Sequence, residues 1–177
     1  MNTYLVPLFA LAAATPALAQ DSGFYASGGY TYLSAEDDGI DVDLGALGAR
    51  AGYKFTPYLG LEGEALFGVA DEDFTFEGVD VSAELNYAVG LYGRVEAPVT
   101  DRVTLYGRLG VVNAELEVTA SVPGVSISES ESETGAGFGA GAEFAVTDTF
   151  GIYADYTRYD IDELEIDGLS VGGKYRF

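Results

Sequence analysis

Twelve charged residues stand at alternate positions within stretches that are otherwise apolar or rich in glycine. They are Arg50, Lys54, Arg94, Arg108, Lys174 and Arg176 with Glu62, Glu64, Glu84, Glu96, Glu143 and Asp155. Carboxylates spaced like Glu62 and Glu64 can do acid–base chemistry or can pair with cations. Because the sequence has no histidine and no cysteine, the usual catalytic arrangements built on those residues are unavailable. We therefore expect ion pairing at these positions, with no catalytic site, no metal site and no cofactor.

A second set of carboxylates lies between these stretches. It comprises Glu36, Asp37, Asp38, Asp41, Asp43, Asp71, Glu72, Asp73, Glu77, Asp80, Glu115, Glu117, Glu129, Glu131, Glu133, Asp160, Asp162, Glu163, Glu165 and Asp167. Carboxylate oxygens suit Ca²⁺ and Mg²⁺, although none of the segments has EF-hand spacing. Binding of divalent cations, including bridging to lipopolysaccharide phosphates, and a solvated acidic rim are both compatible with the pattern. The net charge of −21 argues against nucleic acid as a partner.

The N-terminus has the pattern of a secretory signal peptide. Residues 3–20 carry no charge, and an apolar segment is followed by Ala17-Leu18-Ala19, an Ala-x-Ala cleavage signature. No Lys or Arg precedes the apolar segment, which departs from the usual pattern. We expect a signal peptide over 1–19 and one domain over 20–177.

The rest of the chain reads as eight strands joined alternately by short and long connections. The predicted strands are 23–34, 43–55, 58–69, 81–97, 102–114, 132–145, 150–159 and 166–177, with long loops at 35–42, 70–80, 115–131 and 160–165. Two short connections share Val-Thr-Asp, which an internal repeat and common turn chemistry explain about equally well. Alternation of short turns and long loops is typical of an up-and-down transmembrane barrel. We expect an all-β, eight-stranded antiparallel barrel.

Across the predicted strands, one parity carries essentially no charge and the opposite parity carries the twelve charges. In 81–97, for example, the uncharged set is Val81, Ala83, Leu85, Tyr87, Val89, Leu91 and Val95. A Lys or Arg that faces lipid at the bilayer centre costs about 2–4 kcal/mol, and six would cost about 12–24 kcal/mol. The charges are therefore expected to face the lumen, where tyrosines such as Tyr25, Tyr92, Tyr106 and Tyr153 accompany them. The alternative is a soluble, exported, lipocalin-like cup with the charges outside.

Four segments resemble the outer membrane protein A transmembrane barrel. They are Thr56-Pro57-Tyr58-Leu59-Gly60-Leu61-Glu62-Gly63, Val103-Thr104-Leu105-Tyr106-Gly107-Arg108-Leu109-Gly110, Tyr153-Ala154-Asp155-Tyr156 and Leu169-Ser170-Val171-Gly172-Gly173-Lys174-Tyr175-Arg176-Phe177. No peptidoglycan-binding domain is expected after the barrel, so a cell-wall tether is not implied. Short porin-like members of the broader family are similar in having the barrel alone. The resemblance implies that Tyr175 and Phe177 form the signal read by the barrel-assembly machinery. It also places Glu62, Arg108 and Asp155 where the family has switchable ion pairs.

The sequence thus predicts a monomeric protein of the Gram-negative outer membrane, in contact with membrane lipid and lipopolysaccharide. Eight strands leave room for little more than side chains in the interior, so we expect a lumen plugged by ion pairs. A structural, envelope-integrity or surface-interaction role follows. A narrow, low-conductance channel is the alternative if the pairs can open, and a soluble ligand-binding cup is the other.

Overall fold

The computed structural model describes the backbone of residues 23–37, 40–70, 72–76, 79–122, 125–161 and 164–177. It also describes their side chains, apart from those of 36–37, 40–42, 70, 72–76, 79–84, 116–122 and 125–131. The predicted signal peptide lies outside the described residues. In the described ranges, no helix combines the length and apolar character needed to cross a membrane.

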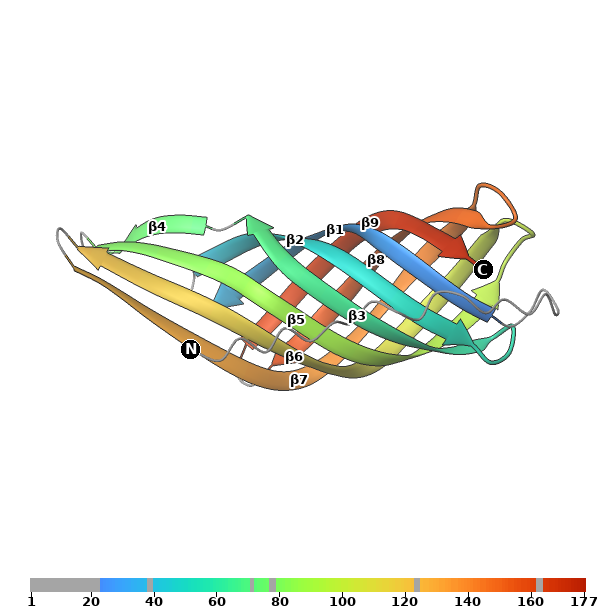
Figure 1. Cartoon of the computed structure of the whole chain (residues 1–177), viewed down its shortest axis with the longest axis horizontal. Coiled ribbons are helices and arrows are strands. Elements are labelled where there is room, and N and C mark those ends of the chain that lie inside the picture. The colour runs from blue at the N-terminus through green and yellow to red at the C-terminus, as the bar shows by residue number, and fades with distance from the viewer. Residues whose placement is uncertain (1–22, 38–39, 71, 77–78, 123–124, 162–163) are drawn as a thin grey trace, which may run out of the picture.

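The strands form one antiparallel sheet in the order β3-β2-β1-β9-β8-β7-β6-β5-β4. They are β1 (Gly23–Asp37), β2 (Ile40–Lys54), β3 (Leu59–Ala70), β4 (Glu72–Phe76), β5 (Val79–Pro98), β6 (Val103–Val122), β7 (Val125–Ala145), β8 (Phe150–Ile161) and β9 (Leu164–Arg176). An additional pairing of β3 with β5 closes the sheet into a barrel (Figure 1). Since β4 pairs with the part of β5 that β3 does not reach, β3 and β4 share one place in the ring. The predicted eight-stranded antiparallel barrel is confirmed.

The long loops predicted from the sequence are largely strand, and this part of the prediction is wrong. β6 and β7 pair without interruption as far as Val122↔Val125, β1 and β2 pair as far as Asp37↔Ile40, and β4 was not foreseen. In Figure 1, β5, β6 and β7 extend at the left beyond the ends of the other strands. The Ser-Glu alternation of residues 128–133 has no apolar face. Hydrogen bonds along a ladder need only the backbone, and they extend the hairpin regardless.

The outer face of the barrel is an apolar belt. Most large apolar residues on this face are 41–67% exposed, among them Leu109 (66%), Val111 (59%) and Ile152 (50%). Aromatic rings gather where the strands meet the short turns: Phe24 and Tyr53 have ring centroids 4.7 Å apart. Exposed large apolar residues lie on every long strand of the ring, whereas soluble monomers expose only limited apolar patches. The arrangement excludes the lipocalin-like cup, whose apolar face would be internal.

One residue assigned to the lipid face lies inside. Leu85 is only 3% exposed, although Val89 and Leu91 on the same parity face outward. The pairing of β5 with β6 shifts register between Leu85 and Tyr87. An extra residue at such a bulge reverses the alternation of the side chains, so parity counted from the turn end fails beyond it.

The interior is divided into a charged layer near the short turns and an apolar layer toward the long hairpins. The apolar layer, hereafter the apolar plug, consists of Leu33, Leu44, Ala46, Leu66, Leu85, Ala88, Val112, Ala114, Tyr159, Ile161 and Ile166. All eleven are buried, with exposed fractions between 0% and 9%. Apart from Leu85, these residues continue the same inward-facing alternation that carries the charges.

Three short turns are built in the same way around a threonine. The hydroxyl oxygen accepts hydrogen bonds from the backbone N–H groups two and three residues later, at 2.9–3.3 Å. The threonines are Thr56, Thr100 and Thr147. Each turn also accepts a 2.8 Å backbone hydrogen bond from a later strand, from Glu96, Ala145 and Arg176 respectively. The geometry shared by the two Val-Thr-Asp turns therefore also occurs in a third turn with a different sequence.

Candidate functional site

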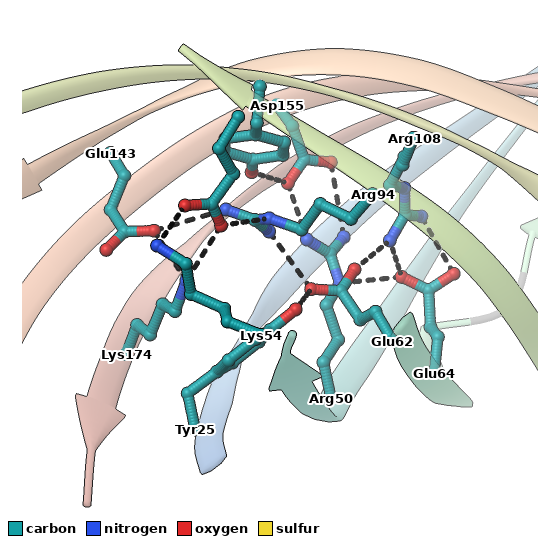
Figure 2. A network of polar contacts seen from close by, with 12 residues as sticks. Tyr25, Arg50, Lys54, Glu62, Glu64, Arg94, Arg108, Glu143, Asp155 and Lys174 are labelled. Carbon is teal, nitrogen blue, oxygen red and sulfur yellow. Dashed lines mark hydrogen bonds and ion pairs between the residues drawn. The ribbon is translucent and has the colours of Figure 1, made fainter. Parts of the chain in front are cut away.

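Eleven of the twelve charged residues singled out in the sequence meet inside the barrel, where they form one connected set of ion pairs (Figure 2). This lumen network comprises Arg50, Lys54, Arg94, Arg108, Lys174, Arg176, Glu62, Glu64, Glu96, Glu143 and Asp155. The side chain of the twelfth, Glu84, lies outside the described residues. Six cations and five carboxylates nearly balance, as buried charges require.

Strand register brings two arginines face to face. Arg94 on β5 and Arg108 on β6 are direct cross-strand partners, an arrangement in which like charges destabilise a sheet. Glu62 of β3 lies between them (Figure 2), with Oε2 3.0 Å from Nη1 of Arg94 and Oε1 3.1 Å from Nη1 of Arg108. The Tyr25 hydroxyl donates a further hydrogen bond to Glu62, at 2.7 Å. The Glu62 carboxylate therefore lies between the two cations and pairs with both.

On the side of Glu62 that faces the long hairpins, two arginines each contact both oxygens of a carboxylate. Arg108 donates to both oxygens of Glu64, at 2.7 and 2.9 Å, and Arg50 donates to both oxygens of Asp155, at 2.5 and 3.1 Å. Arg50 also reaches Glu64 at 2.6 Å, its direct cross-strand partner on β3. Such two-point contacts fix orientation as well as charge.

On the side of Glu62 that faces the short turns, Glu143 and Glu96 pair with the remaining cations. Glu143 pairs with Lys174 at 2.7 Å and with Arg94 at 3.2 Å, and it also pairs with Arg176. Glu96 pairs with Lys54 at 2.6 Å and with Arg94 at 2.8 Å. This end of the network is the more exposed one, since the side chains of Lys54 and Arg176 are 22% and 32% exposed.

Tyrosines complete the hydrogen bonding of the network. The Tyr106 hydroxyl donates to Asp155 at 2.7 Å, and its ring lies 3.6 Å from the guanidinium carbon of Arg94. Lys174 lies over the ring of Tyr25 at 3.8 Å. Contacts of cations with aromatic faces are stronger where water is excluded. Sequence parity placed these tyrosines on the inner face, but it contained no indication of which charge each one meets.

The three residues that the family resemblance associates with switchable pairs do not form a single triad. Arg108 contacts Glu62, whereas Asp155 pairs with Arg50. The apolar plug was not recognised from the sequence, although Leu66 follows Glu62 and Glu64 at the same two-residue spacing. That continuation of the alternation was the available signal.

No group of three or more acidic side chains that could hold a metal ion is found among the described residues. Most acidic side chains of the long hairpins lie outside them. What the described interior can do is pair charges and fill the barrel, because each carboxylate of the lumen network is engaged by cations or hydroxyl groups.

Residues 5–177 match the family model described as the outer membrane protein beta-barrel domain. The fold is similar to Ail, the attachment invasion locus protein of Yersinia pestis, solved in complex with the heparin analogue sucrose octasulfate, with 24% identity and a TM-score of 0.67 over 89% of this chain and 99% of that one. It is also similar to Neisserial surface protein A (17% identity, TM-score 0.64, 88% of this chain and 99% of that one).

A third similar structure is OprG of Pseudomonas aeruginosa, with 16% identity and a TM-score of 0.62 over 89% of this chain and 96% of that one. No curated protein matches the sequence. A lipid-facing apolar belt, a charged interior and the family match agree: the chain belongs to the outer membrane protein beta-barrel family and lies in the outer membrane of a Gram-negative bacterium.

Proposed function

We propose that this protein is a barrel with a filled interior that either stabilises the envelope itself or anchors long acidic hairpins that contact external partners at the cell surface. The observation that carries the proposal is the filling of the lumen by the lumen network and the apolar plug. With the interior occupied by side chains, the parts of the molecule that are free to interact are the hairpins and the lipid-facing belt. In an outer-membrane barrel, the long connections face outside and the short turns face the periplasm.

The charge of the outer end favours cationic partners. Acidic side chains described at this end include Asp43, Glu115, Glu133, Asp160 and Glu165, and the whole chain carries −21. Ail was solved with a polyanion, the heparin analogue, and an acidic surface repels ligands of that kind. Divalent cations that bridge these carboxylates to lipopolysaccharide phosphates are the partners we propose.

Further parts of the proposal concern assembly and chemistry. Tyr175 and Phe177 are exposed, with edge-to-face rings 5.1 Å apart, which supports recognition of the last strand by the barrel-assembly machinery. Pairing of β9 with β1 and of β3 with β5 leaves the membrane-spanning sheet without a free edge, which supports a monomer. Lack of histidine and cysteine supports a role other than catalysis.

Shortening one hairpin separates the structural role from the surface role. Because Glu115 and Ser132 are direct partners in the β6–β7 ladder, a two-residue Asn-Gly turn can replace residues 116–131. In a strain that lacks the protein, a structural role predicts that this variant restores resistance of the envelope to detergents as fully as the natural chain. A surface role predicts correct insertion, shown by heat-modifiable gel migration, with loss of calorimetric heat on addition of Ca²⁺ or Mg²⁺. If deletion of the whole protein changes neither envelope resistance nor cation binding by cells, the proposal is wrong.

A further inference from the structure

The apolar plug crosses the whole interior of the barrel. Seven of the ring's strands contribute to it, since its residues come from β1, β2, β3, β5, β6, β8 and β9. At the same level β7 presents glycines, and the neighbouring space is already filled. A Cβ at Gly137 would lie 2.8 Å from the ring of Tyr92, and a Cβ at Gly135 would lie 2.6 Å from the Cα of Ile161. The plug residues carry no charged side chain. The polar groups at this level are two tyrosine hydroxyls: that of Tyr159 donates to Glu64 at 3.2 Å, and that of Tyr92 lies beside Gly137.

The plug lies on the outer side of the lumen network along each strand that carries both. Leu66 follows Glu62 and Glu64 in β3, and Val112 follows Arg108 in β6, in the direction away from the short turns. In Figure 1 the short turns and the C-terminus lie at the right, opposite the long hairpins. A solute that crosses the barrel would meet the two layers in succession.

Exposure to solvent falls along the same direction. At the periplasmic end, the side chains of Lys54 and Arg176 are 22% and 32% exposed. Deeper in, those of Glu62 and Arg108 are 0% exposed, and Leu66 in the plug is 1% exposed. Water thus reaches the first cations from the periplasm, and it has no contact with the plug from that side.

We infer that the apolar plug, and not the lumen network, is the barrier that closes this barrel to ions and water. Charged side chains can exchange one partner for another or for water, so a layer of ion pairs can be hydrated when a pair opens. A narrow apolar constriction resists wetting, and this is how hydrophobic gates close pores. The inference goes beyond the proposed function and is independent of what the hairpins bind. It assigns a separate role to each layer: the lumen network holds the strands together, and the apolar plug closes the interior of the barrel.

Conductance of the purified barrel in planar bilayers tests the inference. We expect the natural chain and Arg108→Ala to show no steady conductance, and the double variant Leu66→Ser/Val112→Ser to conduct. The matched control is Leu61→Ser/Val111→Ser, which changes lipid-facing residues of the same two strands (41% and 59% exposed) and should not conduct. Each variant is first shown to be folded by heat-modifiable migration. Conductance of Arg108→Ala with Leu66 and Val112 intact would overturn the inference, as would a folded double variant that stays closed.

A conservative variant keeps the test decisive if the double variant does not fold. The natural chain has no cysteine, so Leu66→Cys introduces a single thiol into the plug, and Val99→Cys places one in a periplasmic turn where the natural side chain is 59% exposed. We expect a small, charged, thiol-specific reagent to label Val99→Cys completely while Leu66→Cys stays unlabelled, in the natural background and in the Arg108→Ala background alike. Labelling of Leu66→Cys in the natural background would show that water occupies the plug, and the inference would be wrong.

Discussion

Replacement of Glu62 by Gln tests how much the negative charge of Glu62, which pairs with both Arg94 and Arg108, contributes to stability. The variant has nearly the same shape, so it leaves no cavity, but it removes the only negative charge that contacts both Arg94 and Arg108 among the ion pairs of the described lumen. The two guanidinium groups remain on directly paired positions of β5 and β6. All three side chains are at most 3% exposed, so solvent cannot take over the role of the carboxylate.

The expected loss is that of a buried pair from which one partner is removed, about 3–5 kcal/mol. For a domain of this size, about 2–4 °C of melting temperature corresponds to 1 kcal/mol, so the midpoint should fall by about 6–20 °C. Thermal unfolding in detergent, followed by heat-modifiable gel migration, measures this shift. Glu165→Gln is the matched control, because Glu165 pairs with Arg158 at 3.2 Å on the outer surface with 62% of its side chain exposed. That variant should melt close to the natural protein.

A double variant tests the reason for the loss. If repulsion between the two arginines causes it, then Glu62→Gln combined with Arg108→Met should lose less stability than the sum of the two single changes, because residues in contact are not additive. Equal melting temperatures for Glu62→Gln and Glu165→Gln would refute the reasoning. Strict additivity in the double variant would refute the part that concerns repulsion.

Three further changes test other parts of the structure by comparison with the natural protein. Arg108→Ala removes the contacts to Glu62 and Glu64 and should lower the free energy of unfolding in detergent by about 3–5 kcal/mol. The control Leu109→Ala, at the lipid-facing neighbour, should change it little, and equal melting midpoints for the two variants would contradict a packed network. Thr100→Val removes the acceptor of two backbone N–H groups in a turn and should lower the free energy of unfolding by about 0.5–2 kcal/mol, by analogy with helix caps. Thr100→Ser keeps the hydroxyl and should retain stability, and a loss of stability in both variants would point to another cause. Deletion of Phe177 should reduce the fraction of protein inserted in cells more than the melting temperature of the folded barrel, and normal insertion would rule out the assembly signal.

The sequence by itself determined the class of the protein and the direction of most of its side chains. A strand has a strict two-residue period, so charges on one parity and apolar residues on the other define an inside and an outside before any contact is known. Arg50, Glu64 and Arg108 could be placed in the lumen on this basis, and Leu109 and Val111 on the lipid face.

Only the tertiary structure decided which side chains meet and at what height. Closure of a barrel staggers its strands, so residues far apart in the sequence, such as Arg50 and Asp155, come to 2.5 Å, while Arg94 and Arg108 face each other with Glu62 between them. A single bulge near Leu85 reversed the alternation in β5. Height along the axis also divided one inward-facing parity into a charged layer and an apolar layer. Parity specifies a face, but the partners on that face depend on register and stagger, which are properties of the closed sheet.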